Sequence, residues 1–135
     1  MAPLHILLTG AAGRIGTILR PALAGRYGKV RLLDRRPVEN IASNEEALIG
    51  DITDRATLHR AVEGVDAVVH MAGYPRIGDW NEILPLNIAA TYELLDASRL
   101  AGVKRFVIAS SHHAIGYYPR TETVGTDAQV RPDSG

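Results

Sequence analysis

Residues 9–16 read TGAAGRIG, with glycines at positions 10, 13 and 16. They follow a short apolar run at residues 4–9, and residues 18–28, ILRPALAGRYG, carry apolar side chains at helical spacing. This order predicts a strand, a tight turn and a helix that starts inside the motif. Pro21 is expected to kink the helix or restart it near Arg20.

The glycine spacing is typical of a turn that binds phosphate groups. Gly10 permits the tight turn, Gly13 lets backbone N–H groups approach a pyrophosphate, and Gly16 lets helix and strand pack closely. The helix dipole would then face the phosphates, with the N–H groups of Arg14 and Ile15 as donors. A glycine pattern alone is weak evidence, but the strand before it and the helix after it support a dinucleotide site.

Further strands and helices alternate along the rest of the chain. Short apolar segments predict strands at residues 30–34, 47–51, 65–73 and 104–111. Helical patterns occupy residues 53–64, where Thr53 is suited to cap the helix, and residues 81–102, with a bend expected near Pro85 and a stop at Gly102. The remainder after the fifth strand is rich in turn residues, and no helix is expected there.

This alternation implies right-handed crossovers and a parallel sheet with helices on both faces. The prediction is a doubly wound, Rossmann-like α/β fold with strand order 3-2-1-4-5, formed by one dinucleotide-binding domain over residues 1–135. Strands that are buried on both faces do not alternate, which agrees with their nearly continuous apolar runs. A ligand should bind at the carboxyl ends of the strands, between the first and the fourth.

Composition limits the class of protein. The 135 residues are 46% hydrophobic and 22% charged, and 15 Lys plus Arg balance 15 Asp plus Glu, which predicts one globular domain. Zero net charge without a basic run argues against nucleic-acid and anionic-membrane partners. The apolar run at residues 4–8 is too short to span a membrane. The absence of cysteine fits a reducing compartment, with the cytoplasm as the default.

Asp34 ends the second strand 18 residues after Gly16, close to the spacing of an acid that accepts hydrogen bonds from an adenosine ribose. A carboxylate there repels a 2′-phosphate, which favours NAD over NADP as the cofactor. Arg35 and Arg36 argue the other way, since a guanidinium beside that position can hold the phosphate. The alternative interpretation of Asp34 is a turn residue at the end of a strand.

Two further pairs of residues follow strands at the expected cofactor edge. Asp51 could accept a hydrogen bond from the adenine amino group while Ile52 packs on the ring; alternatively, Asp51 is the N-terminal residue of a helix. Ala72 and Gly73 end the fourth strand with small side chains, as a backbone that passes close to a dinucleotide requires. A simple turn is the alternative there.

TGAAGRIG, Asp34, GDITD, VVHMAG, LNIAAT and FVIASS occur in this order and spacing over nearly the whole chain. In this, the sequence resembles the extended short-chain dehydrogenase/reductase superfamily, which includes the NAD-dependent epimerase/dehydratase family. IASSHHAIGYYPRTE followed by RPDSG is most similar to uronate dehydrogenases and related sugar oxidoreductases.

The resemblance implies roles for four residues. Ser111 matches the catalytic serine whose hydroxyl holds the reacting sugar oxygen beside a catalytic tyrosine. His112 and His113 match a segment that contacts the substrate. Asn87 matches a side chain that supports the geometry of the cofactor and active site. For the full-length protein, the resemblance implies NAD-dependent oxidation of C1 of a hexuronic acid to an aldarolactone.

Other polar residues are given structural roles. His70 is expected to be structural, and Tyr117 and Tyr118 to pack the turn beside the site. No metal site is expected, because no carboxylate or histidine pair has ligand spacing on one face.

Two departures from the family pattern stand out. Pro75 occupies the position at which the uronate enzymes carry a substrate-binding serine, which leaves the exact substrate open. The superfamily also requires a tyrosine followed four residues later by a lysine, whereas the only lysines here are Lys29 and Lys104 and neither has a tyrosine four places before it.

The chain ends at RPDSG, where the family continues into the Tyr-x-x-x-Lys helix. The resemblance therefore implies a fragment that is inactive alone and whose fifth strand lies at an exposed apolar edge. It allows a homo-oligomer for the full-length protein. Two alternatives stay open: a nucleotide-sugar epimerase, dehydratase or reductase of the same superfamily, and a non-catalytic NAD-binding module.

Overall fold

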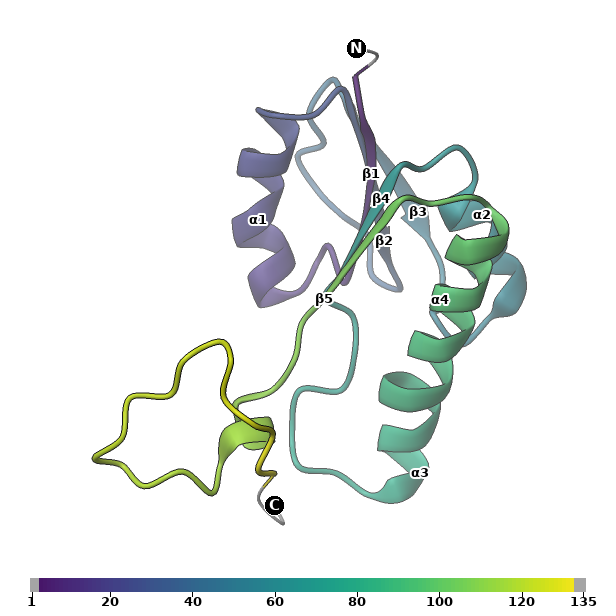
Figure 1. Ribbon diagram of the computed structural model, residues 1–135. Coiled ribbons are helices and arrows are strands. Elements are labelled where there is room, and N and C mark those ends of the chain that lie inside the picture. The colour runs from purple at the N-terminus through teal and green to yellow at the C-terminus, as the bar shows by residue number, and fades with distance from the viewer. Residues whose placement is uncertain (1–2, 133–135) are drawn as a thin grey trace.

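The computed structural model describes residues 3–132, which form a five-stranded sheet and the helices that pack on it (Figure 1). All neighbouring strands are parallel, and the strand order β3-β2-β1-β4-β5 confirms the predicted topology. The strands are β1 (His5–Thr9), β2 (Lys29–Asp34), β3 (Glu45–Ile49), β4 (Ala67–His70) and β5 (Arg105–Ile108).

Helices cover both faces of the sheet, as predicted (Figure 1): α1 (Arg14–Ala24) packs on one face, and α2 (Arg55–Val62) and α4 (Ala90–Leu100) on the other. Each face has its own hydrophobic core. Leu7 of β1 belongs to the core beneath α2 and α4, while the next residue, Leu8, belongs to the core beneath α1. Successive strand residues point to opposite faces, so a central strand needs apolar side chains throughout.

The structure corrects the first predicted helix. Helix α1 runs through Pro21 to Ala24, so the predicted restart near Arg20 is wrong. Pro21 lies on the exposed side of the helix, while Leu19 and Leu23 pack against the core beneath it. Tertiary packing of an apolar face provides most of the stability of such a helix and outweighs one missing hydrogen bond.

The second predicted helix is capped one residue later than expected. The Asp54 carboxylate accepts hydrogen bonds from the N–H groups of Ala56 and Thr57 and is the N-cap of α2. The Thr53 hydroxyl instead donates to Asp51. The prediction that Thr53 caps the helix is therefore wrong, because the turn after β3 already uses its side chain.

The long helical pattern at residues 81–102 consists of three consecutive helical segments. These are α3 (Trp80–Ile83), a π-helical segment η1 (Leu84–Ala89) and α4. The change of helix type begins beside Pro85, where a bend was expected. Pro85 has no N–H to donate to the helical ladder, which favours a change of helix type at this point, and single π-helical turns often occur at functional sites.

A short 3₁₀ helix, η2 (His112–Ile115), follows β5, so the prediction that no helix follows this strand is wrong. The Ser111 hydroxyl oxygen caps it by accepting a hydrogen bond from the N–H of His113 at 3.2 Å. From there the chain makes a long excursion away from the sheet (Figure 1). Residues 133–135, the end of the RPDSG segment, lie outside the described residues.

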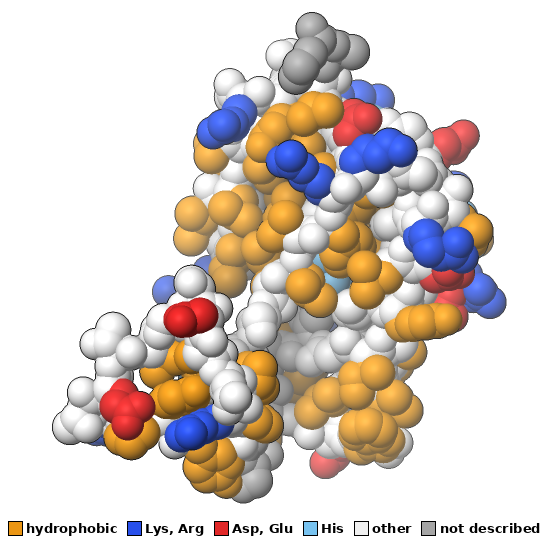
Figure 2. All heavy atoms as spheres, viewed as in Figure 1, with side chains coloured by type: hydrophobic (Ala, Val, Ile, Leu, Met, Phe, Trp, Pro, Cys, Tyr) orange, Lys and Arg blue, Asp and Glu red, His pale blue; other side chains and the backbone are white. Residues whose placement is uncertain are grey.

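Strand β5 is an edge strand, as predicted. Val107 and Ile108 are 55% and 49% exposed, and Figure 2 shows hydrophobic side chains gathered on the face that carries β5. Within residues 3–132, no helix is long and apolar enough to cross a membrane.

Candidate functional site

The glycine-rich turn after β1 is held tightly between its two neighbouring strands. Gly10 has a positive φ of 68°, and a Cβ there would lie 2.8 Å from the backbone nitrogen of Ala72, after β4. The N–H groups of Gly10 and Ala11 donate to the carbonyl of Leu33 in β2, at 2.9 and 3.3 Å. A Cβ at Gly16 would overlap the Gly10 carbonyl oxygen, so α1 can approach the turn only because this residue is glycine.

The N-terminus of α1 offers uncapped backbone donors. Gly13 is its N-cap residue and has no side chain that could accept a hydrogen bond from the first helical N–H groups. Arg14 and Ile15, the first two helical residues, are exposed. The first N–H groups of a helix have no partner within it, and the helix dipole adds a partial positive charge at that end. This end of α1 is therefore suited to an anionic group such as a phosphate.

Asp34 joins the end of β2 to the same turn. Its side chain is buried, Oδ2 accepts a hydrogen bond from the N–H of Ala12 at 2.9 Å, and Oδ1 accepts one from the N–H of Arg36 at 2.9 Å. A carboxylate has about four acceptor positions, so both oxygens retain capacity for ribose hydroxyls. The structure thus places Asp34 beside the glycine turn, as the spacing predicted.

Asp51 and Ile52 follow β3 at the same edge of the sheet. The Asp51 carboxylate accepts hydrogen bonds from both the N–H and the hydroxyl of Thr53, each at 2.9 Å. Ile52 is only 8% exposed and packs in the core beneath α2 and α4. Contact of these two residues with an adenine ring stays a prediction.

A buried network that the sequence analysis missed supports the end of β4. The Thr9 hydroxyl oxygen lies 3.2 Å from the backbone nitrogens of both Met71 and Ala72, and 2.7 Å from Nδ1 of His70. Because the oxygen accepts from both backbone N–H groups, its proton is donated to Nδ1. His70 is then the Nε2–H tautomer and donates to the Thr91 hydroxyl at 3.1 Å.

Burial lowers the pKa of His70 to about 4, which keeps its ring neutral at neutral pH. Thr9 and His70 are opposite each other in the parallel β1–β4 pair. The only sequence signal for this network is a polar residue at the end of each of two apolar strands. His70 is buried and hydrogen-bonded to Thr9 and Thr91, in keeping with the structural role expected of it, and the Thr9 hydroxyl in turn accepts the N–H of Ala72 beside the glycine turn.

Asn87 holds the loop that leaves β4. Its Oδ1 accepts a hydrogen bond from the N–H of Tyr74 at 2.6 Å, and its Nδ2 donates to the carbonyl of Tyr74 at 3.0 Å. A Cβ at Gly73 would lie 3.0 Å from the same Oδ1, so the loop passes directly over this side chain. The π-helical segment therefore presents an amide that fixes the backbone beside Ala72 and Gly73.

Ser111, His112 and His113 lie after β5, one strand further from the glycine turn. The His112 and His113 rings are 4.2 Å apart between centroids. Figure 1 shows this segment and the loop after β4 leaving the sheet at the same end. Contact of Ser111, His112 and His113 with a substrate stays a prediction.

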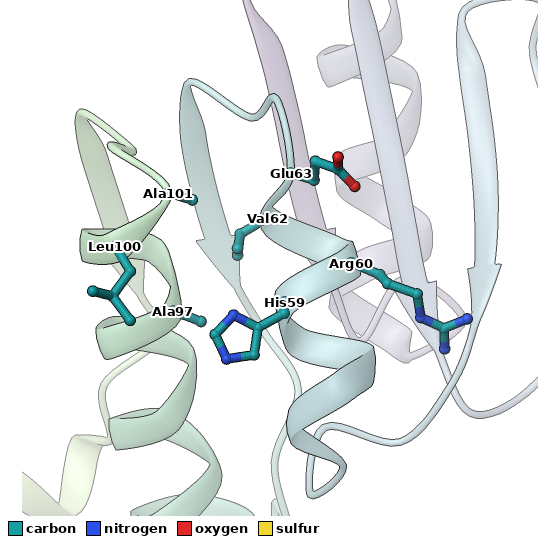
Figure 3. A pocket seen from close by; sticks show the side chains of 7 residues that line it. All are labelled: His59, Arg60, Val62, Glu63, Ala97, Leu100 and Ala101. Carbon is teal, nitrogen blue, oxygen red and sulfur yellow. The ribbon is translucent and has the colours of Figure 1, made fainter.

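A shallow pocket lies between the C-terminal ends of α2 and α4, near the amino ends of the strands. Figure 3 shows His59 pointing from α2 toward α4, while Arg60 and Glu63 point away from it. The C-terminal ends of these helices lead into β4 and β5 at the amino ends of the strands, away from the cofactor edge. Among the described residues, no group of three or more histidines, cysteines and acids could hold a metal ion.

Fold and site together define a dinucleotide-binding α/β protein, and comparison with known families specifies which one. The model of the NAD dependent epimerase/dehydratase family matches residues 6–134. The chain belongs to this family, which confirms the resemblance noted in the sequence.

The relatives that the chain matches include uronate dehydrogenases. It is 42% identical over 131 residues to the uronate dehydrogenase of Pseudomonas putida and 41% identical over 129 residues to that of Agrobacterium fabrum, in each case over 96% of this chain and 49% of the relative. The chain thus spans about half the length of the curated relatives it matches.

Solved structures agree with this placement. A glucuronic acid dehydrogenase from Chromohalobacter salexigens superposes with a TM-score of 0.90 at 39% identity, over 98% of this chain and 50% of that one. A mutant uronate dehydrogenase from Agrobacterium tumefaciens, complexed with NAD, gives a TM-score of 0.88 at 40% identity, over 96% and 49% of the two chains.

Proposed function

We propose that residues 1–135 form the NAD-binding part of a sugar-oxidising dehydrogenase. The observation that carries this proposal is the hydrogen bond between the Asp34 carboxylate and the glycine turn. The buried carboxylate accepts the Ala12 N–H at 2.9 Å, directly before the uncapped N-terminus of α1. An acid suited to binding ribose hydroxyls and a helix end suited to binding phosphate therefore lie side by side, which supports a dinucleotide as the ligand.

The residues present fit NAD. There is no room for a Cβ at Gly10 or Gly16, so these glycines let the turn pack against the end of β4 and let α1 begin close to the turn. The proposal assigns the pyrophosphate to Gly13, Arg14 and Ile15, the adenosine to Asp34, Asp51 and Ile52, and the crossing of the crevice to Ala72, Gly73 and Asn87. Bound NAD supplies an acceptor for hydride from the substrate carbon.

For the substrate we propose a hexuronic acid, oxidised at C1 to an aldarolactone in the full-length protein. The support is the similarity to uronate and glucuronic acid dehydrogenases at 39–42% identity. In this proposal Ser111 orients the sugar hydroxyl, and His112 and His113 contact the sugar. Pro75 occupies the position of the expected serine, so the contacts to the substrate should differ from the uronate pattern there.

The first test is calorimetric titration of the 135-residue chain with NAD, after its folding and monodispersity have been checked. Wild type is expected to bind NAD. Gly13→Asp should abolish binding by placing a carboxylate at the helix end, and Asp34→Ala should weaken it by removing the ribose acceptor. Asp96→Ala, which changes a partly exposed acid on α4, is the matched control and should leave binding unchanged. A folded wild-type chain that does not bind NAD would refute the proposal.

The second test is turnover. Purified chain with NAD and glucuronate or galacturonate is expected to produce no NADH, because the chain lacks a tyrosine–lysine pair to take the hydroxyl proton. Measurable, substrate-dependent NADH formation that is lost in Ser111→Ala would contradict this expectation of inactivity.

A further inference from the structure

Arg36 follows the end of β2, and its side chain contacts the glycine turn. One of its guanidinium nitrogens, Nη2, donates to the Ala12 carbonyl at 2.5 Å, and its backbone N–H donates to Oδ1 of Asp34. Asp34 in turn accepts the Ala12 N–H through Oδ2. The N–H of Ala12 is therefore held by the Asp34 carboxylate and its carbonyl by the Arg36 guanidinium, two side chains that are two residues apart in sequence.

The guanidinium keeps hydrogen-bonding capacity after this anchoring. Arg36 is 61% exposed at its side chain, and its Nε lies 3.6 Å from Oδ1 of Asp34, beyond hydrogen-bond distance. Arginine has five N–H donors in a fixed fork, of which the Ala12 carbonyl uses one. Arg20 differs, since its side chain is only 13% exposed and its guanidinium donates to Glu39, Asn40 and Glu45.

The charges at this corner favour an additional anion. Asp34 is the acid that faces the Arg36 guanidinium, while Arg35 and Arg36 both follow it. The sum over these three side chains is one positive charge. A carboxylate at this position ordinarily rejects a phosphate on the neighbouring ribose oxygen, but an adjacent anchored guanidinium offsets that repulsion and can hold the phosphate through paired hydrogen bonds.

We infer that Arg36 makes the adenosine end of this site accept a 2′-phosphate, so that the chain binds NADP alongside NAD. The inference rests on the proposed function, because it assigns the ribose to Asp34. It goes beyond the expectation from Asp34 alone, which favours NAD over NADP. Arg36 acts here as a specificity-determining residue: its hydrogen bond to the Ala12 carbonyl fixes the guanidinium beside the glycine turn, while most of its side chain stays exposed to a ligand.

The test compares NAD and NADP by calorimetric titration of wild type, Arg36→Ala and Arg35→Ala. Arg35 is the matched control, since it carries the same charge one residue away, is exposed, and its side chain makes no hydrogen bond or ion pair within residues 3–132. Wild type is expected to bind the two cofactors within about tenfold of each other. Arg36→Ala should weaken NADP binding by about tenfold or more and NAD binding by less than about threefold. Arg35→Ala should leave the ratio unchanged.

Each other result overturns the inference in an identifiable way. Equal weakening of both cofactors by Arg36→Ala would mean that the residue only positions the turn. The same effect from Arg35→Ala would mean that net charge, not position, matters. NAD binding with NADP more than about a hundredfold weaker in wild type would mean that Asp34 decides the preference. If wild type binds neither cofactor, the proposed function itself fails. Thermal melts of all three proteins establish that each is folded.

Discussion

Gly10 combines a positive φ with a close approach to Ala72, and a pair of substitutions can separate what each feature would cost in unfolding free energy. Gly10→Ala adds a Cβ in a left-handed conformation and 2.8 Å from a backbone nitrogen, and should cost about 3 kcal/mol of unfolding free energy. Gly64 has the same φ of 68° with nothing within 4 Å of its Cβ position, so Gly64→Ala should cost only about 1 kcal/mol. Urea denaturation measures both; equal costs would mean that the contact with β4 adds no strain.

His70 makes stability depend on pH in a defined direction. Its pKa is lowered by burial from 6.5 to about 4 in the folded protein, so the unfolded chain binds the additional proton between these values. The contribution of the neutral, buried His70 to the unfolding free energy is therefore complete above about pH 6.5. It is lost as the pH falls toward 4, by about 3 kcal/mol in total.

The measurement is the difference in unfolding free energy between wild type and His70→Gln at several pH values. Carboxylates titrate in both proteins and cancel in this difference. His70→Gln should be destabilised at pH 7, because it breaks the chain from Thr9 to Thr91, and that deficit should shrink toward pH 4. A deficit that does not change with pH would show that His70 titrates normally in the folded state.

At the scale of elements, one buried ion pair ties α1 to β3. Arg20 holds Glu45 through two hydrogen bonds, at 2.6 and 3.2 Å, and the Glu45 side chain is only 2% exposed. Arg20→Met should cost about 3 kcal/mol, because it leaves the carboxylate buried without its partner. Arg99→Met, which breaks the exposed pair with Asp96, should cost less than about 0.5 kcal/mol.

The pH dependence of this pair distinguishes loss of charge from loss of packing. The hydrogen bond from Arg20 is the main cause that lowers the pKa of Glu45 below its ordinary 4.5. A lowered carboxyl pKa gives stability that is present above about pH 4.5 and lost at lower pH, so the deficit of Arg20→Met should shrink on acidification. A deficit that stays constant in acid would assign it to the lost packing of the arginine stem.

The elements also show what the sequence could and could not predict. Strand order and the join of Asp34 to the glycine turn follow from local periodicity and spacing, which a single sequence displays. The Thr9–His70 contact exists only through the β1–β4 register, so no local pattern indicates it. The choice of Asp54 over Thr53 as helix cap was also hidden, because both residue types cap helices and a hydrogen bond to Asp51 decides between them.

At the scale of the whole molecule, the edge strand β5 should make this chain self-associate. Its unpaired backbone groups and its half-exposed Val107 and Ile108 offer a template for another strand. Sedimentation velocity should show an average mass that rises with protein concentration. A lysine on an edge strand opposes such pairing through charge and desolvation, so Val107→Lys should weaken the association by about tenfold or more.

Ile18→Lys is the matched control, because it removes an exposed apolar side chain from α1, away from the sheet edge. It should leave the association unchanged. If both lysine substitutions weaken association equally, general hydrophobicity of the surface drives it and β5 has no special part. A wild-type chain that stays monomeric at all concentrations would contradict the prediction. The short length of β5, four residues, would then be enough to prevent strand pairing.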